Sequence, residues 1–154
     1  MALVYEHLYQ AESLVRIPMK PYLQDLSAHI LQTFGGGRAI TLSVEVAPVS
    51  LDVETAMPCG LIVNELVTNA LKYAFPAGVK EADEVRVEFR AEDATYTLVV
   101  SDNGVGLPPG LDWRKPKTMG LRLVSFWATH QLGGKLEVDD RQGTAFKVTF
   151  VGRE

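Results

Sequence analysis

The chain has 154 residues and 47% hydrophobic residues, which fits one domain built on a single hydrophobic core. Its formal net charge is −4, with 15 basic residues spread among 19 acidic ones, and this excludes a general nucleic-acid-binding protein because phosphate contacts need clustered Lys and Arg. The lone Cys59 excludes an intramolecular disulfide, and no apolar run reaches the roughly 20 residues that span a bilayer. We therefore expect a cytoplasmic domain that contacts neither nucleic acid nor membrane.

Two helices are expected in the first part of the chain. Residues 1–10 place apolar side chains at helical spacing, as at the end of an amphipathic helix that enters from an upstream segment. Pro18 and Pro21 suit the start of a second helix, because the first helical turn does not need the N–H that proline lacks, and the glycines at 35–37 suit its end.

The middle of the chain predicts strands on either side of a long helix. Apolar and polar residues alternate from Ile40 to Val46 and, more weakly, after Pro48, which predicts two strands of an antiparallel sheet. From Cys59 to Ala74 the apolar residues follow a period of 3.6, which predicts a helix. Alternation returns at Val85–Phe89 and Tyr96–Val100, which we expect to form a hairpin.

The last third predicts a long loop, a helix and two strands. The Gly- and Pro-containing stretch 103–117 is too long for a simple turn and indicates a functional or mobile loop. Thr118 can cap a helix that Gly133 ends, and 135–138 and 144–151 supply the last strands. Helices on one face of a mixed, mostly antiparallel sheet give an α+β fold, a two-layer α/β sandwich.

Three polar side chains line up on the helix predicted from Cys59 to Ala74. Glu65, Asn69 and Lys72 are spaced four and three residues apart, so they share one helix face. An amide oxygen is a hard ligand suited to Mg²⁺, an ammonium offsets phosphate charge, and a carboxylate can accept a proton or orient a nucleophile. The set fits a metal–phosphate group, and an ordinary solvated helix face is the alternative interpretation.

Three further segments carry candidate binding residues. Asp102 ends an apolar strand and can accept a hydrogen bond from an exocyclic amine such as that of adenine, while Gly104 and Gly106 let a ligand approach the main chain; an ordinary turn is the alternative. The segment 118–122 begins a helix, whose free N–H groups can bind phosphate. Thr144 opens the last strand with a hydroxyl that can reach a bound base.

Together these segments resemble the GHKL ATPase superfamily, which is named for gyrase, the heat-shock chaperone, histidine kinases and MutL. NELVTNALKY resembles its N box, DNGVG its G1 box, TMGLRLV its G2 box, and GTAFKVTF its closing strand. The four segments occur in the family order, with a lid-sized loop between the second and third. The resemblance covers about residues 56–150 and implies the Bergerat-type ATP-binding fold.

The resemblance implies a role for each matching residue. Glu65 is implied as the catalytic residue, since it matches the general base of the hydrolysing members and in a kinase would orient and deprotonate the acceptor imidazole. Asn69 is implied as the ligand of Mg²⁺. The residues implied to bind ATP are Asn69, Lys72, Tyr73, Asp102, Gly104, Gly106, Gly120, Leu121 and Thr144.

The N-terminal segment HLYQAESLVRIPMKPYLQDL resembles the connection between dimerisation helix and catalytic domain in bacterial sensor kinases related to the HWE group. This implies that residues 1–12 end a dimerisation and phosphoacceptor helix and that 13–154 form the catalytic domain. The implied function is transfer of the ATP γ-phosphoryl group to a histidine on a dimerisation domain absent from this chain, and then to a response regulator. The full-length protein is expected to be a homodimer, and the isolated domain is expected not to phosphorylate itself.

Two alternatives share the fold. A serine kinase of the anti-sigma-factor type has a similar length but does not need the N-terminal connecting segment. A nucleotide-binding interaction module without turnover is less consistent with the retained Asn69 and Asp102. Phosphorylation of a serine on a partner protein, or binding without transfer, would distinguish them.

Overall fold

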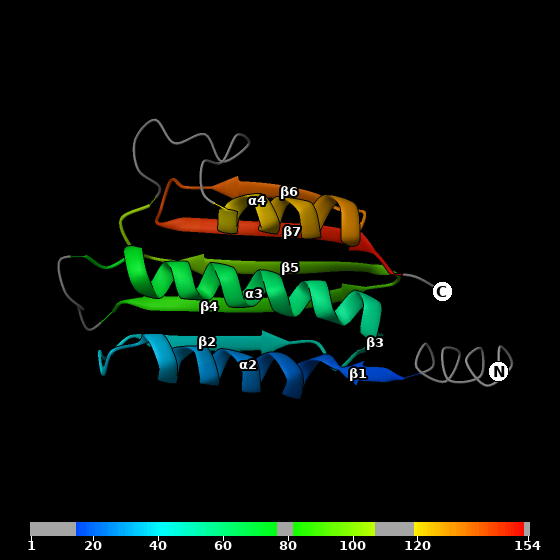
Figure 1. The fold of residues 1–154 in the computed structure, drawn as a ribbon, viewed down its shortest axis with the longest axis horizontal. Coiled ribbons are helices and arrows are strands. Elements are labelled where there is room, and N and C mark those ends of the chain that lie inside the picture. Colours follow the sequence, from blue (N-terminus) through cyan, green and yellow to red (C-terminus); the bar gives the residue numbers. More distant parts are fainter. Residues whose placement is uncertain (1–14, 77–81, 107–118, 153–154) are drawn as a thin grey trace, which may run out of the picture.

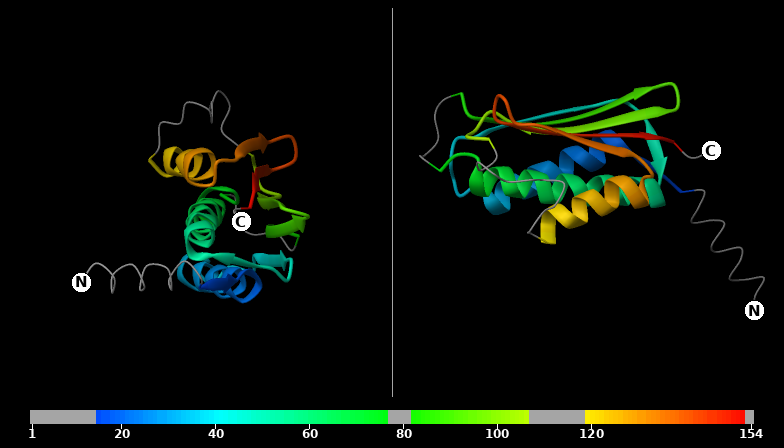
Figure 2. Two further views of the ribbon diagram at one scale, coloured as in Figure 1. Left: turned by 90° about the vertical axis from the view of Figure 1, so that its right-hand side faces the viewer. Right: turned by 90° about the horizontal axis from the view of Figure 1, so that it is seen from above.

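A computed structural model describes residues 15–76, 82–106 and 119–152. It contains two layers, a five-stranded sheet and a layer of helices that covers one face of it (Figures 1 and 2). The helices are α2 (Met19–Phe34), α3 (Val53–Tyr73) and α4 (Met119–Phe126), which continues as the π-helical turn η1 (Trp127–Gln131). The predicted α+β two-layer sandwich is confirmed. The predicted N-terminal helix, the Thr118 cap and residues 107–117 of the long loop lie outside the described residues.

The strand order of the main sheet is β2-β4-β5-β7-β6. Neighbouring strands are antiparallel except β2 and β4, which run parallel. The prediction of antiparallel pairing for 40–46 was wrong, because the connection through α3 returns the chain to the end of the sheet at which β2 began. The strands are β2 (Thr41–Val46), β4 (Glu84–Glu92), β5 (Thr95–Asp102), β6 (Lys135–Asp139) and β7 (Thr144–Val151).

The strand predicted after Pro48 does not join the main sheet. It is β3 (Ser50–Asp52), and it pairs antiparallel with β1 (Arg16–Pro18) in a separate two-stranded sheet. The Met19 N–H donates to the Val49 carbonyl over 2.9 Å, so this segment is bound to the start of α2 instead of to β2.

Helix α3 begins six residues before the predicted start. The helical period was followed only from Cys59, but Pro58 lies inside the helix and is buried. Proline removes one helical hydrogen bond. The buried Ala56 and Cys59 continue the apolar face across it, and burial of that face favours the longer helix. Glu54 in the first turn and Lys72 in the last turn also complement the helix dipole.

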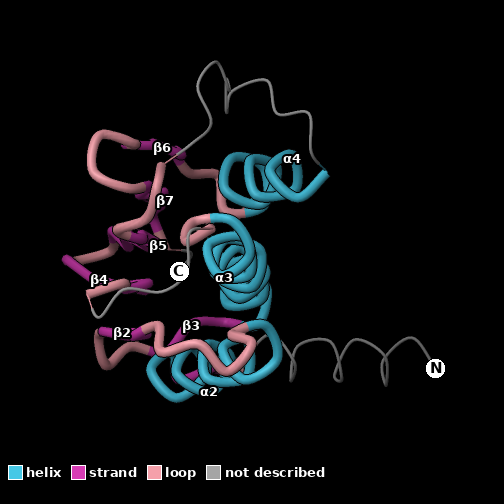
Figure 3. The backbone as a smooth tube through the Cα atoms, turned by 90° about the vertical axis from the view of Figure 1, so that its left-hand side faces the viewer, coloured by secondary structure: helices cyan, strands magenta, loops and turns pink. Residues whose placement is uncertain are grey.

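The core lies between the two layers, with α3 between α2 and α4 (Figure 3). Fully buried side chains of α3, such as Ile62 and Val67, belong to the same cluster as Val87 and Leu98 of the sheet. The outward-facing residues of β4 are charged, and Arg90 pairs with Glu88 at 2.7 Å. Among the described residues, no helix has the length and apolarity of a membrane-spanning segment.

Candidate functional site

The end of α3, the end of β5 and the start of α4 meet at the left-hand end of the molecule in Figure 1. The Val105 N–H donates to the Ala74 carbonyl over 2.9 Å, so the loop after β5 is fixed to the C-terminal end of α3. Three of the four segments singled out in the sequence, the N box, the G1 box and the closing strand, therefore contribute residues to one region. The start of α4 joins them through Gly120.

Glu65 and Asn69 are joined on α3, as their spacing predicts. The Asn69 Nδ2 donates to the Glu65 Oε1 over 3.1 Å, and both residues are half-buried. A carboxylate can only accept, so the amide must present its NH₂ group to Glu65 and its oxygen elsewhere. That orientation leaves the Asn69 oxygen as the atom suited to a cation.

Gly120 is the residue of α4 that lies against Glu65. A Cβ atom at position 120 would overlap the Glu65 carboxylate, so only a residue without a side chain allows this approach. Leu121, the next residue, is partly buried and packs against the core. The predicted phosphate-binding segment of α4 is therefore adjacent to the predicted catalytic carboxylate.

Asp102 ends β5, directly opposite Val85 on one side and Thr144 on the other. Its carboxylate accepts the Gly104 N–H over 2.9 Å. Burial raises the pKa of the Asp102 carboxyl above 3.8, and hydrogen bonds from the backbone N–H groups of Gly104 and Thr144 offset part of that rise. Thr144 is buried beside it. The fold thus holds a partly desolvated acceptor at the end of the sheet.

Glycines allow the close packing around Asp102. A Cβ at Gly104 would overlap the Ala74 carbonyl, and Gly106 has a φ of 80°, which disfavours other residues. Gly143 has a φ of 76°, and a Cβ there would overlap the Asp102 carbonyl oxygen. Gly143 was not among the predicted site residues, although it directly precedes the Thr144 that was.

Asn103 is a second residue that the sequence interpretation missed. Its Nδ2 donates to the Ala82 carbonyl over 2.6 Å, and its Oδ1 accepts the Glu84 N–H over 2.8 Å. These bonds fix the loop after β5 to the start of β4. The side chain therefore positions the loop that follows Asp102.

Lys72 and Tyr73 lie at the C-terminal end of α3, and both are exposed. The Lys72 Nζ lies 5.2 Å from the centroid of the Phe34 ring, which comes from the end of α2. The basic loop residues at 114, 115 and 117 lie outside the described residues.

Residues 54–153 match the family described as histidine kinase-, DNA gyrase B-, and HSP90-like ATPase. The chain belongs to this ATPase family. Domains of this family bind ATP.

Known relatives of this ATPase domain are sensor kinases. Blue-light-activated histidine kinase 2 of Erythrobacter litoralis is 34% identical over 128 residues, which are 83% of this chain and 36% of that protein. Sensor histidine kinase PdtaS of Mycobacterium tuberculosis is 34% identical over 91 residues, 58% of this chain and 18% of that protein. The chain thus spans about a third or less of the length of these relatives.

A solved histidine kinase domain from the blue-light-activated kinase EL346 of Erythrobacter litoralis has the same fold. Its TM-score is 0.79 at 31% identity, over 88% of this chain and 61% of that one. The chain is therefore an ATPase domain of the type found in the catalytic part of sensor histidine kinases, and these relatives do not favour the serine-kinase or non-catalytic alternatives.

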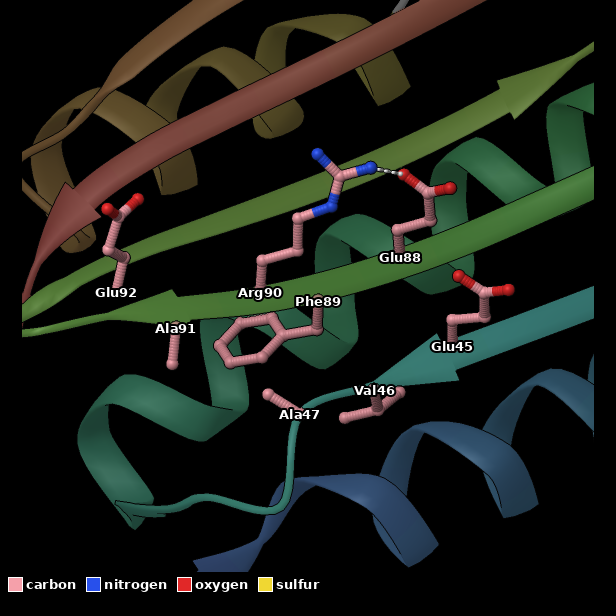
Figure 4. Close-up of a pocket in the computed structure, with 8 residues that line it drawn as sticks. All are labelled: Glu45, Val46, Ala47, Glu88, Phe89, Arg90, Ala91 and Glu92. Atoms are coloured by element: carbon pink, nitrogen blue, oxygen red, sulfur yellow. Dashed lines mark hydrogen bonds and ion pairs between the residues drawn. The ribbon is translucent and has the colours of Figure 1, made fainter.

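A groove of about 510 Å³ lies at the other end of the sheet, where β2 ends (Figure 4). Glu45, Glu88 and Glu92 line it, and Arg90, the basic residue of the lining, is paired with Glu88. Carboxylates at this density would repel a triphosphate. The groove is therefore unsuited to a nucleotide triphosphate.

Proposed function

We propose that this domain binds Mg²⁺-ATP and transfers its γ-phosphoryl group to a histidine on the dimerisation domain of the full-length protein, from which it passes to a response regulator. The observation that carries the proposal is the meeting of Glu65, Asn69, Gly120 and Asp102 around the C-terminal half of α3. We also propose that residues 1–12 end the dimerisation helix, that 13–154 form the catalytic domain, and that the full-length kinase is a homodimer.

The adenine end of ATP is assigned to the end of the sheet. Asp102 accepts a hydrogen bond from the exocyclic amine of adenine, and Thr144 lies beside it to contact the same base. Gly104 and Gly106 keep side chains out of the space that the base needs. The raised pKa of Asp102 supports the assignment of adenine to this residue, because it indicates that the carboxylate is partly desolvated. A desolvated acceptor discriminates between bases that can and cannot donate a hydrogen bond to it.

The phosphate end is assigned to α3 and α4. Mg²⁺ in ATP sites is held largely by phosphate oxygens and waters with one or two protein ligands, which fits the single amide oxygen of Asn69. The cation neutralises charge that develops on the transferred group. Lys72 and Tyr73 contact phosphates from the last turn of α3. The N–H groups of Gly120 and Leu121 bind phosphates from the start of α4.

Glu65 acts on the acceptor. A histidine attacks the γ-phosphorus with one ring nitrogen while the bond from that phosphorus to the bridging oxygen breaks and ADP leaves. The other ring nitrogen carries a proton that a carboxylate can accept as the N–P bond forms. Glu65 is held for this role by the Asn69 amide and by contact with Gly120. The rest of the catalysis is positioning and charge neutralisation, as in other phosphoryl transfers.

Asn69→Ala tests the metal–phosphate assignment. We expect its Mg²⁺-dependent affinity for a fluorescent ATP analogue to fall by about 10- to 100-fold, because the amide oxygen is lost. The matched control is Asn64→Ala, which removes an exposed amide from the same helix on another face and should bind like wild type. Equal Mg²⁺-dependent binding by both variants would contradict the assignment.

Transfer itself is tested by adding a phosphoacceptor dimerisation domain in trans with labelled ATP. The expected product is phosphohistidine, which is lost on acid treatment. An acid-stable phosphoserine on a partner protein would instead support the serine-kinase alternative, and ATP binding without any product would support the interaction module.

Gly120→Ala separates catalysis from binding. The introduced methyl group would overlap the Oε1 and Cδ atoms of Glu65, which end a flexible side chain and can move aside. Alanine also favours a helix over glycine by up to about 1 kcal/mol, so the melting temperature is not expected to fall. Because the Glu65 carboxylate is displaced, we expect transfer to drop about 100-fold with a smaller loss of ATP affinity. If the transfer rate and the ATP affinity fell by the same factor, Glu65 would have no catalytic role separate from binding.

A further inference from the structure

We infer that Arg38 is a positioning residue that fixes the end of α3 and, through it, the loop that follows Asp102. The inference rests on the proposed binding of adenine at Asp102. Arg38 lies in the turn between α2 and β2, far from the ATPase motifs in the sequence, and its side chain donates to backbone carbonyls. It therefore acts on the site through the main chain.

Arg38 joins the end of α2 to the end of α3, which lie side by side at the left-hand end of Figure 1. Its Nε donates to the Gly35 carbonyl over 3.1 Å, and its guanidinium donates to the Leu71 carbonyl in the last turn of α3. The last carbonyls of a helix lack a partner within the helix, and a cation that donates to one of them also complements the helix dipole. Arg38 therefore stabilises the last turn of α3.

The last helical bond of α3 runs from the Ala74 N–H to the Ala70 carbonyl over 3.0 Å. Leu71 carries the next carbonyl along the chain, and this is the one that accepts the Arg38 guanidinium. The arginine thus takes over at the point where the helical ladder stops. Without it, the end of α3 is free to open, as helix termini do when their final groups have no fixed partner.

Ala74 connects the end of α3 to the Asp102 loop. Its carbonyl accepts the Val105 N–H over 2.9 Å, and a Cβ at Gly104 would overlap the same carbonyl, so the loop lies directly against it. The Asp102 carboxylate in turn accepts the Gly104 N–H over 2.9 Å. A shift of the end of α3 therefore moves the backbone that orients the Asp102 carboxylate.

The turn after α2 aims the Arg38 side chain at α3. Gly36 and Gly37 have φ values of 64° and 73°, the left-handed conformation that glycine adopts without strain, and they reverse the chain. The Arg38 N–H also donates to the Gly35 carbonyl over 3.1 Å, so the backbone and the Nε of Arg38 share one acceptor. The rigid guanidinium fork then has a donor left for Leu71.

The test compares Arg38→Met with Arg38→Lys, using calorimetric titration of the whole chain with Mg²⁺-ATP and with adenosine. Arg38 is half-buried, and methionine keeps an apolar stem without a donor, so the variant is expected to fold. We expect Arg38→Met to weaken the binding of both ligands by the same factor, about three- to ten-fold, because both carry adenine. Arg38→Lys retains a donor and should bind within about two-fold of wild type.

Amide hydrogen exchange separates positioning from a general loss of stability. In Arg38→Met the Val105 amide should exchange faster, by a larger factor than the amide of Leu98 in the middle of β5. A purely structural role would accelerate both amides equally and leave the affinity of the folded protein unchanged.

Arg16→Met is the matched control. Arg16 also donates from its guanidinium to a backbone carbonyl, that of Ser50, over 2.8 Å, but it does so in the small β1–β3 sheet at the right-hand end of Figure 1. Its loss should leave the affinity for ATP and adenosine, and the exchange of the Val105 amide, like those of wild type.

Three results would overturn the inference: wild-type affinity in Arg38→Met, equal acceleration of the Val105 and Leu98 amides, or a loss of ATP affinity without a loss of adenosine affinity. The last would mean that Arg38 acts at the phosphate end. Asp102→Asn, titrated with adenosine, separates this from the proposed function. If it weakens binding and Arg38→Met does not, the positioning role is wrong and the adenine site stands. If it binds like wild type, the adenine site fails and the inference fails with it.

Discussion

Gly104→Ala is expected to lower nucleotide affinity by at least about 100-fold. The new Cβ would overlap the carbonyl oxygen of Ala74 and approach its carbonyl carbon and Cβ to 2.7 Å. These atoms end α3 and cannot move as a flexible side chain would. The same carbonyl accepts the Val105 N–H, so relief of the clash breaks that bond and displaces the loop that carries Asp102. Titration with the fluorescent ATP analogue measures the loss.

Gly133→Ala is the matched control for this change. Gly133 has a φ of 63°, but a Cβ there meets no atom within 4 Å. The substitution therefore introduces backbone strain of about 1 to 2 kcal/mol without a clash. We expect a lower melting temperature and unchanged nucleotide affinity. Wild-type affinity in Gly104→Ala would mean that the loop after β5 is not part of the nucleotide site.

Asp102→Asn is expected to weaken ATP binding by about 10- to 100-fold while leaving the melting temperature near that of wild type. The binding loss follows because a hydrogen bond to a charged acceptor contributes about 1.5 to 3 kcal/mol. The stability argument follows from the pKa, which burial raises. A carboxyl with a raised folded-state pKa contributes stability that is fully present below its unfolded pKa and is lost as the pH rises through its folded-state pKa. Near neutral pH the charge of Asp102 therefore opposes folding.

The pH dependence of adenosine binding checks the same carboxylate without interference from titrating phosphates. Protonation of Asp102 removes an acceptor, so affinity should fall on acidification, and at a higher pH than the ordinary value of 3.8 would give. This dependence should be absent in Asp102→Asn. The same pH profile in both proteins would assign the effect to another group.

Local sequence patterns were sufficient to predict those parts of the site that are formed by residues close together in the sequence. The spacing of Glu65 and Asn69 places them on one helical turn, and their hydrogen bond follows from that geometry. Asp102 was identifiable as a polar residue at the end of an apolar strand.

Contacts between distant segments could not be derived in that way. Gly143 touches Asp102 and Phe34 touches Lys72 only because the fold brings them together. Alternation likewise indicates which residues of a strand face the core but not which strand it pairs with. This is why the parallel pairing of β2 and the separate pairing of β3 with β1 were not predicted.

The parallel pairing of β2 also bears on the order in which the chain can assemble. The β4–β5 pair closes through a short turn at Asp93, and β6–β7 is also a local hairpin. The residues of β2 reach their partners in β4 only after the whole of α3 has been placed, which costs more loop-closure entropy. Edge strand β2, which carries no site residue, is thus the strand of the main sheet that has no local hairpin partner. The strands that carry Asp102 and Thr144 each belong to a hairpin whose contacts can form early.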